Sequence, residues 1–203
     1  MKKVVNLWDL KTDSYYTITR DAVSEIKEKG SRFIAYAYKV TDVSEVEAKI
    51  AALKKEHYNA RHHCYAYRIG LGGAINRAND DGEPSSTAGR PILGQMLSAD
   101  VSDVLVVVVR YFGGILLGTS GLIVAYKGAT ASVLEEAGRE EKVLREWVEV
   151  EVGYAEVDKV MKIVKRRELP VAPMEYRGVG CVIKIEVRES EKDDLLQEIN
   201  NKY

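Results

Sequence analysis

A run of six apolar residues, Val104 to Val109, constrains the fold more than any other segment of the chain. Because no polar side chain interrupts the run, both faces of the strand that it predicts must be covered. The run is far too short to cross a lipid bilayer. It ends at Arg110, and functional residues commonly lie where a buried strand enters a loop. We therefore expect a central buried strand with a candidate site at its end.

Two glycine-containing loops, at residues 79–91 and 110–121, flank this strand, and each precedes a helical pattern. Free backbone N–H groups and the dipole at a helix N-terminus favour an anion. Such loops also serve as plain turns and caps, and neither has a phosphate-loop or Gly-x-Gly-x-x-Gly pattern. The candidate residues are Asp80, Asp81, Glu83, Ser85, Thr87 and Arg90 in the first loop, and Arg110, Tyr111, Gly113 and Gly114 in the second.

The composition limits the class of function. The 203 residues suffice for one large or two small domains, and an apolar share of 46% allows a real core. Lys and Arg number 30 against 31 Asp and Glu, so binding to nucleic acid or a membrane would need a local patch. The chain has two cysteines, no Cys-x-x-Cys pair and no signal-peptide pattern. We expect a soluble cytoplasmic protein with free thiols and no membrane contact.

Periodicity predicts the elements of the first part of the chain. Residues 22–27 either pair with the strand before them or follow it as another strand. The pattern predicts strands at residues 15–20, 22–27, 32–40 and 61–69, and a loop at residues 70–79. It predicts one helix from Asp42 or Ser44 as cap to about His57, one that starts between Thr87 and Arg90 because Pro91 fits only a first turn, and one from Thr119 or Ser120 as cap to Ala137.

The predicted strand at residues 61–69 carries two histidines and a cysteine. Alternation places His62, Cys64 and Arg68 on one face, and His63 and Tyr67 on the other. His62 and Cys64 could share a metal ion, but no third ligand lies nearby in the sequence. We therefore assign no metal and no cofactor, and expect Cys64 to pack and His62 to form a hydrogen bond.

A new pattern begins after a charged boundary near residues 139–142. It predicts a strand at residues 143–152, a helix at 155–168, a hairpin of 171–177 with 179–188, and a last helix that Ser190 caps. The order β-α-β-β-α predicts a small two-layer domain of about 60 residues. The expected domains are residues 1–138 and 142–203, and the fold class is α+β.

The motifs of the first part resemble those of the IMPACT/YigZ family. They are Arg32-Phe33-Ile34-Ala35, the run from His63 to Arg68, the runs Asp80 to Ser85 and Thr87 to Leu93, and Val106 to Gly114. The segment after Lys142 resembles the small C-terminal domain of bacterial members. The sequence departs from the family pattern at four positions: Leu116 replaces a lysine, Val124 replaces an arginine, and Ser86 and Ser120 replace glycines.

The resemblance implies an α/β first domain related to the second domain of a small-subunit ribosomal protein and to domain IV of elongation factor G. It also implies a ferredoxin-like second domain. Eukaryotic members regulate a translation-control kinase by competing for its activator, and bacterial members are linked to RNA or the translation machinery. The resemblance therefore implies a role near translation.

The sequence leaves two hypotheses for the function. In the first, a non-enzymatic regulatory protein contacts RNA, the ribosome or a protein partner through Arg68, Arg90 and Arg110, with Tyr67, Tyr111 and Phe112. Alternatively the two aromatics Tyr67 and Phe112 are core, and Arg90 and Arg110 pair with Asp80, Asp81 or Glu83 to hold the two loops together. In the second hypothesis, the acids, hydroxyls and histidines form a hydrolase-type site for a phosphorylated or other small substrate, with no catalytic residue assigned. No sequence feature indicates an oligomeric state.

Overall fold

The computed structural model describes residues 13–201. The chain divides into two compact units. Residues 15–142 form the first unit, and the residues from Val143 onward, with Asp13 and Ser14, belong to the second unit. The structure contains both helices and sheets, so the predicted α+β class is confirmed. The division into functional domains at residues 1–138 and 142–203 stays a prediction.

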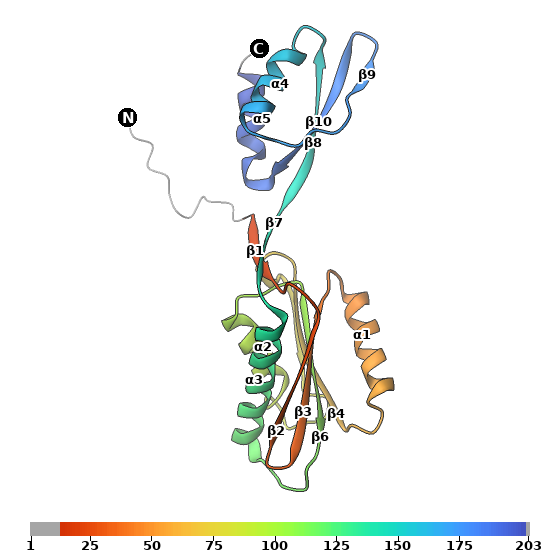
Figure 1. Ribbon diagram of the computed structural model, residues 1–203, viewed down its shortest axis with the longest axis vertical. Coiled ribbons are helices and arrows are strands. Elements are labelled where there is room, and N and C mark those ends of the chain that lie inside the picture. Colours follow the sequence, from red (N-terminus) through yellow and green to blue (C-terminus); the bar gives the residue numbers. More distant parts are fainter. Residues whose placement is uncertain (1–12, 202–203) are drawn as a thin grey trace, which may run out of the picture. The chain divides into compact units, whose positions relative to one another are not determined.

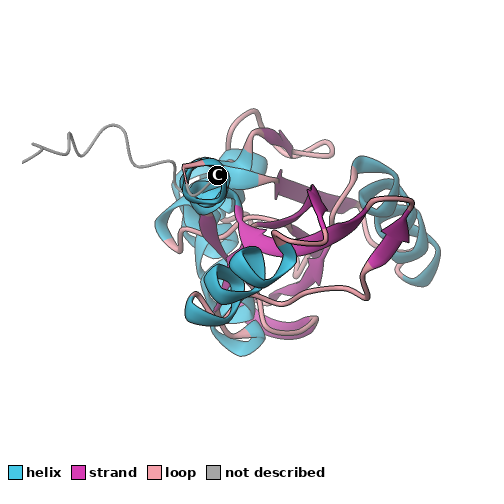
Figure 2. Ribbon diagram, turned by 90° about the horizontal axis from the view of Figure 1, so that it is seen from above, coloured by secondary structure: helices cyan, strands magenta, loops and turns pink. Residues whose placement is uncertain are grey.

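The first unit is built on a five-stranded sheet with the order β2-β3-β6-β4-β5, in which all neighbouring strands are antiparallel. The strands are β2 (Ala22–Glu28), β3 (Ser31–Lys39), β4 (His62–Ile69), β5 (Ile75–Asn79) and β6 (Val104–Tyr111). Helices α2 (Gly89–Ser98) and α3 (Gly118–Ala137) cover one face, and α1 (Val43–Glu56) covers the other (Figure 1). Figure 2 shows strands lying between helices.

The central strand β6 confirms the prediction of a strand covered on both faces, because all six residues from Val104 to Val109 are fully buried. Val104, Val106 and Val108 pack in one core with side chains of α2 and α3. The alternate residues, from Leu105 to Val109, pack in a second core under α1. Two apolar layers therefore meet along one strand, and its end is fixed from both sides.

Local chemistry accounts for two of the three helix starts. The Asp42 side chain accepts a 2.9 Å hydrogen bond from the Glu45 backbone N–H, so it caps α1 as predicted. Pro91 lies in the first turn of α2, also as predicted. The predicted cap of α3 is wrong, because the helix starts at Gly118 and Thr119 and Ser120 lie inside its first turn.

Of the two alternatives for residues 22–27, the structure shows a further strand that does not pair with the one before it, and the structure corrects one predicted loop. The first strand, β1 (Ser14–Thr17), pairs with β7 (Glu140–Val143), while β2 pairs with β3. The predicted loop at residues 70–79 is wrong in its second half, because β5 lies there and pairs with β4 after a short 3-10 turn, η2 (Leu71–Gly73). β1 pairs with a strand that is distant in the sequence, and β5 is an edge strand next to β4. Local propensity indicates neither pairing.

The second unit has the predicted element order. It contains β8 (Arg145–Gly153), α4 (Val157–Arg166), β9 (Glu175–Arg177), β10 (Gly180–Arg188), a short 3-10 turn η3 (Glu189–Glu191) and α5 (Lys192–Asn200), with antiparallel sheet order β8-β10-β9. Figure 1 shows α4 and α5 on the same face of this sheet, where they share one core with β8 and β10. The Ser190 cap is wrong, because the Ser190 hydroxyl donates to the Asp13 carboxylate at 2.6 Å.

Two glycines hold the loop after β6 against the turn between β2 and β3. A Cβ atom on Gly113 would lie 1.9 Å from the Gly30 carbonyl carbon, so no larger residue fits there. The Gly113 N–H also donates to the Ser31 hydroxyl at 3.2 Å. The glycine loop is therefore anchored at its first turn to the edge of the sheet.

We expect Gly113→Ala to lower the free energy of unfolding by more than about 1 kcal/mol, because the new methyl group displaces the turn at Gly30. Urea denaturation of the full chain measures this. The control is Gly94→Ala within α2, where a Cβ meets nothing within 4 Å and helix propensity should raise stability by about 0.5 to 1 kcal/mol. A Gly113→Ala protein as stable as the wild type would contradict the close approach.

Candidate functional site

Asp80 organises the first loop. One carboxylate oxygen accepts hydrogen bonds from the backbone N–H groups of Ala88 and Gly89 at 3.0 and 2.8 Å, and the other accepts from Ser86 at 2.8 Å. These bonds satisfy N–H groups at the start of α2. Both oxygens of the Asp80 carboxylate therefore cap the N-terminus of α2 from outside the helix.

Asp81 connects the loop to β4 and α1. Its carboxylate accepts from the His63 backbone N–H at 2.7 Å and pairs with the Lys54 ammonium at 3.0 Å. Burial alone would raise the pKa of Asp81, but the His63 N–H and the Lys54 charge outweigh it and hold the pKa below its usual value. Asp81 therefore stays ionised as a structural acceptor.

Glu83 and Arg110 form a buried ion pair between the two loops. The Arg110 Nη1 lies 2.6 Å from the Glu83 Oε1, and the side chains are only 7% and 3% exposed. The same oxygen accepts a 2.9 Å hydrogen bond from the Tyr126 hydroxyl of α3. The predicted pairing of Arg110 with an acid of the first loop is confirmed, and it joins the end of β6 to the acidic loop.

Aromatic rings surround the Arg110 guanidinium. Its central carbon lies 5.5 Å from the Phe33 ring centre and 5.7 Å from that of Phe112. The Nε atom is buried and has no hydrogen-bond partner among residues 13–201. Arg110 therefore lies in largely apolar surroundings, and the Glu83 carboxylate balances its positive charge.

Cys64 and Tyr126 complete the buried network below the ion pair. The Cys64 sulfur lies 3.0 Å from the Asp80 carbonyl oxygen and 3.3 Å from the Tyr126 hydroxyl oxygen. Burial raises the pKa of the Cys64 thiol and of the Tyr126 hydroxyl far above their usual values. Both groups stay protonated, so the thiol is not a nucleophile at neutral pH.

The hydroxyls and the histidine near the acidic loop make separate hydrogen bonds. Thr87 is buried and its hydroxyl donates to the Pro84 carbonyl at 2.7 Å, whereas Ser85 is exposed. The His62 Nδ1 lies 2.9 Å from the Asp81 carbonyl oxygen, which can only accept, so this nitrogen carries the proton. Between residues 13 and 201, no serine or threonine of the loop is hydrogen-bonded to a histidine, and no group of three His, Cys, Asp or Glu could hold a metal ion.

A pocket of about 200 Å³ opens above the ion pair, lined by Arg61, His62, Arg110, Phe112 and Leu116. The aromatic and aliphatic side chains come from the glycine loop, where Phe112, Ile115 and Leu116 are 52%, 56% and 83% exposed. Gly114, between Phe112 and Ile115, has a positive φ of 88°, a conformation that favours glycine. We name this exposed apolar segment, with Arg61, the loop surface.

The structure does not bring every candidate residue to this surface. Arg68 lies at the opposite end of β4, where it donates to the carbonyls of Val101 and Gly72 at 2.6 and 2.8 Å. Arg90 is exposed on α2 and makes no ion pair within residues 13–201, so its predicted pairing with the loop acids is wrong. Tyr111 contacts the second core, and its hydroxyl lies 2.9 Å from His57 Nδ1. Of the two other aromatics, Tyr67 is core and Phe112 is exposed.

Sequence reasoning did not select Arg61, His62 and Leu116 as contact residues. His62 lies directly opposite Arg110 in the register of β4 with β6. Alternation places His62 on the Cys64 face of β4, but the alignment of β4 with β6 decides which residue it meets. Comparison with the family pattern marks Leu116 only as the replacement of a lysine. An exposed leucine beside Phe112 is itself a signal for apolar contact.

Comparison with known proteins identifies the family. Residues 29–134 match the sequence profile of the Impact N-terminal domain. The chain is 37% identical over 163 residues to the IMPACT family member YvyE of Bacillus subtilis, which covers 80% of this chain and 75% of that protein. It is 35% identical over 166 residues to an IMPACT family member of Haemophilus influenzae, covering 80% and 81%. The chain therefore belongs to the IMPACT family.

A solved structure described as a hypothetical protein is similar over almost the whole chain. The TM-score is 0.67 at 26% sequence identity, with coverage of 94% of this chain and 93% of that one. In the part of the chain that the structure describes, no helix has both the length and the apolar character that a membrane crossing requires.

We expect Glu83→Gln to lower the free energy of unfolding by about 3 kcal/mol, because it leaves the buried Arg110 charge without a counter-ion. The double variant Glu83→Gln/Arg110→Met removes that charge and should recover much of the loss. Urea denaturation measures both. Glu25→Gln, which breaks the exposed Arg32–Glu25 pair, serves as the control and should change stability little. If Glu83→Gln and Glu25→Gln lowered the free energy of unfolding by similar amounts, the buried Glu83–Arg110 pair would not be a structural link between the two loops.

The stability should fall on mild acidification because of His63. Burial lowers the pKa of His63 despite the nearby Asp81 carboxylate, so the folded state favours the neutral ring and the unfolded state binds the extra proton. The contribution of neutral His63 to the free energy of unfolding is therefore present above the unfolded pKa of about 6.5, and it is lost as the pH falls below that value.

Urea denaturation at about pH 7.5 and pH 5 tests this, because the loss involving Asp81 begins only near its unfolded pKa of about 3.9. His63→Gln should flatten the dependence of the free energy of unfolding on pH. Equal slopes for the wild type and His63→Gln would show that His63 is not the titrating group.

Proposed function

We propose that this member of the IMPACT family is a non-enzymatic regulatory protein linked to translation, and that a protein partner docks on the loop surface. The observation that carries the proposal is the exposure of Phe112, Ile115 and Leu116 on a loop whose base is fixed by the Gly30 contact. Exposed apolar groups on a rigid support are typical of partner-binding sites. The link to translation rests on the role that the family resemblance implies, and a cytoplasmic location is part of the same proposal.

The charges near the loop surface favour a protein partner over RNA or the ribosomal RNA surface. Glu83 neutralises Arg110, and Leu116 stands where the family pattern that this sequence resembles has a lysine. Of the charged side chains that line the pocket, only Arg61 lacks an ion pair among residues 13–201. Phosphate recognition depends on several free cations, whereas a partner's apolar side chain needs only the pocket floor of Phe112 and Leu116.

The hydrolase alternative lacks such support. Asp80, Asp81 and Glu83 each accept hydrogen bonds or ion pairs from within the fold. A general base or nucleophile needs a free lone pair next to a reacting group, and the hydroxyls of the loop have no basic partner in the described chain. The acidic loop is better explained as the support of the binding surface.

The two fold names belong to the same proposal. In the second unit, the antiparallel order β8-β10-β9 with both helices on one face supports the ferredoxin-like interpretation. In the first unit, the five-stranded sheet with α2 and α3 on one face supports the relation to the ribosomal-protein and elongation-factor domains that the resemblance implies.

Affinity capture from a lysate of the source organism tests the proposal, with the bound proteins identified by mass spectrometry before and after ribonuclease treatment. We expect a component of the translation machinery that stays bound after ribonuclease treatment and is lost with Phe112→Ala/Leu116→Ala. Truncating two side chains of an interface centre typically weakens binding by about 2 kcal/mol or more.

The matched control is Leu71→Ala/Ile75→Ala, which truncates two exposed apolar side chains elsewhere on the first unit and should keep the partner. Loss of the partner after ribonuclease treatment would assign the contact to RNA instead. Capture that survives Phe112→Ala/Leu116→Ala would remove the loop surface from the proposal.

A further inference from the structure

The outer side of α4 in the second unit is strongly basic. Between residues 159 and 167, which Asp158 and Glu168 flank, the sequence has five cations and no acid: Lys159, Lys162, Lys165, Arg166 and Arg167. The apolar residues of the same helix, including Ile163, face the core that α4 shares with β10 and α5. In a chain with a formal net charge of −1, this is a local concentration of positive charge.

The fold accounts for the two arginines and for Lys165, which lies in the last turn of α4, but not for Lys159 and Lys162. Arg166 and Arg167 both pair with Glu198 of α5, and cations in a last turn are favourable to the helix dipole. Lys159 lies in the first turn, where the dipole disfavours a cation. Lys162 has like charges three residues away on both sides, which destabilises an isolated helix. Within residues 13–201, Lys159, Lys162 and Lys165 make no ion pair.

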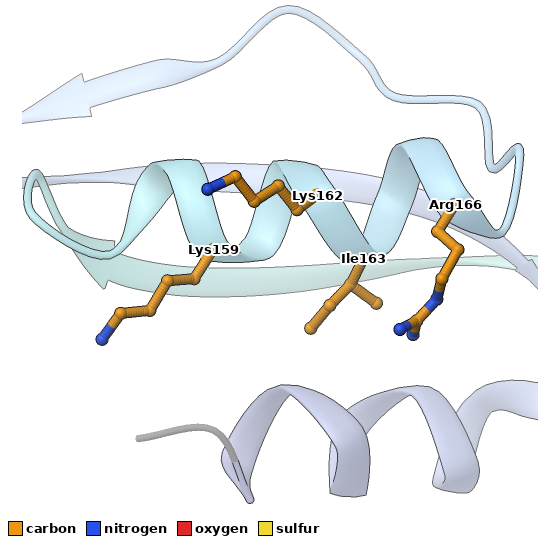
Figure 3. A pocket seen from close by; sticks show the side chains of 4 residues that line it. All are labelled: Lys159, Lys162, Ile163 and Arg166. Atoms are coloured by element: carbon orange, nitrogen blue, oxygen red, sulfur yellow. The ribbon is translucent and has the colours of Figure 1, made fainter.

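A hollow of about 430 Å³ accompanies these charges, lined by Lys159, Lys162, Ile163 and Arg166. Figure 3 shows Lys159, Ile163 and Arg166 extending from α4 to the same side, with Lys162 lying across the helix. Ile163 is only 3% exposed and forms an apolar floor. The hollow thus combines the ammonium groups of Lys159 and Lys162 at its rim with a small apolar base.

The shape and charge fit a strand of phosphates. At 1.5 Å per residue, the cations from Lys159 to Arg166 extend over about 10 Å along the helix, which is about three nucleotides of a stacked strand. A membrane surface is a poorer fit, because α4 has no large exposed apolar side chain to insert. An apolar floor beneath the charges suits the edge of a sugar or base rather than a fully hydrated acidic side chain.

We propose that this basic surface of α4 binds the phosphodiester backbone of a single-stranded nucleic acid. Lys159, Lys162 and Lys165 supply the phosphate contacts, and the hollow over Ile163 accepts a sugar or base edge. The surface belongs to the second unit and is independent of the loop surface of the first unit, so either proposal can fail without the other.

Fluorescence anisotropy of the full chain with a labelled oligouridylate and a labelled oligothymidylate, each of about a dozen nucleotides, tests this between about 50 and about 200 mM salt. We expect binding at low salt that weakens as salt rises. Lys159→Gln/Lys162→Gln/Lys165→Gln should reduce the slope of log affinity against log salt by about 2, since each phosphate contact contributes about 0.7. Binding of both oligonucleotides supports backbone recognition, and binding of RNA alone supports it with added contacts to the 2′-hydroxyl.

The charge-matched control is Lys27→Gln/Lys55→Gln/Arg77→Gln, which removes three exposed cations of the first unit and should leave the slope unchanged. Phe112→Ala/Leu116→Ala should also bind the oligonucleotides like the wild type. The lysine variant should melt at the wild-type temperature or higher, because repulsion within α4 is relieved.

Three results would overturn the proposal. The first is no binding of either oligonucleotide at low salt. The second is an equal loss of slope in the lysine variant and its control. The third is displacement by oligoglutamate of the same charge as effectively as by unlabelled oligouridylate, which would assign the surface to acidic proteins.

Discussion

The buried ion pair of Glu83 with Arg110 is the interaction on which the first unit's site depends. Its two residues are 27 positions apart, and they close the acidic loop over the end of the central strand β6. Removing two charges from water is expensive, and the pair persists because the Tyr126 hydroxyl and two aromatic rings complete the surroundings. Such a pair fixes geometry more than it adds stability, since neither partner tolerates the loss of the other.

This constraint decides what the site can do. The acids of the first loop cap a helix, hold a strand and neutralise an arginine, so each has a structural role. The most exposed side chains of the glycine loop are apolar, as at Phe112 and Leu116, and the exposed cation beside them is Arg61. The second unit shows the opposite distribution, with lysines on α4 that the fold leaves unpaired among the described residues. The apolar loop surface and the basic surface of α4 are thus two chemically different surfaces, one on each unit, and each has its own proposed occupant.

Features determined by local sequence could be predicted well. The unbroken run from Val104 to Val109 indicated a strand buried on both faces, and Asp42 and Pro91 marked helix starts. Features determined by distant partners could not. The pairing of β1 with β7 and the strand β5 depend on neighbours that the sequence does not reveal, and Ser190 is taken by Asp13 rather than by its own helix. In the site, opposite charges predicted the ion pair of Arg110 with the first loop. The positions of Arg90 and Arg68 depend on the orientation of α2 and on the register of β4, which the sequence does not reveal.

The most direct test of the structural role of the Glu83–Arg110 pair is hydrogen exchange, measured by mass spectrometry on the full wild-type chain and on Glu83→Gln. Because one ion pair joins the acidic loop to the glycine loop, exchange should become faster in peptides covering residues 80–89 and in those covering residues 110–118, while the second unit stays unchanged. Faster exchange confined to residues 80–89, with the glycine loop unaffected, would contradict the account.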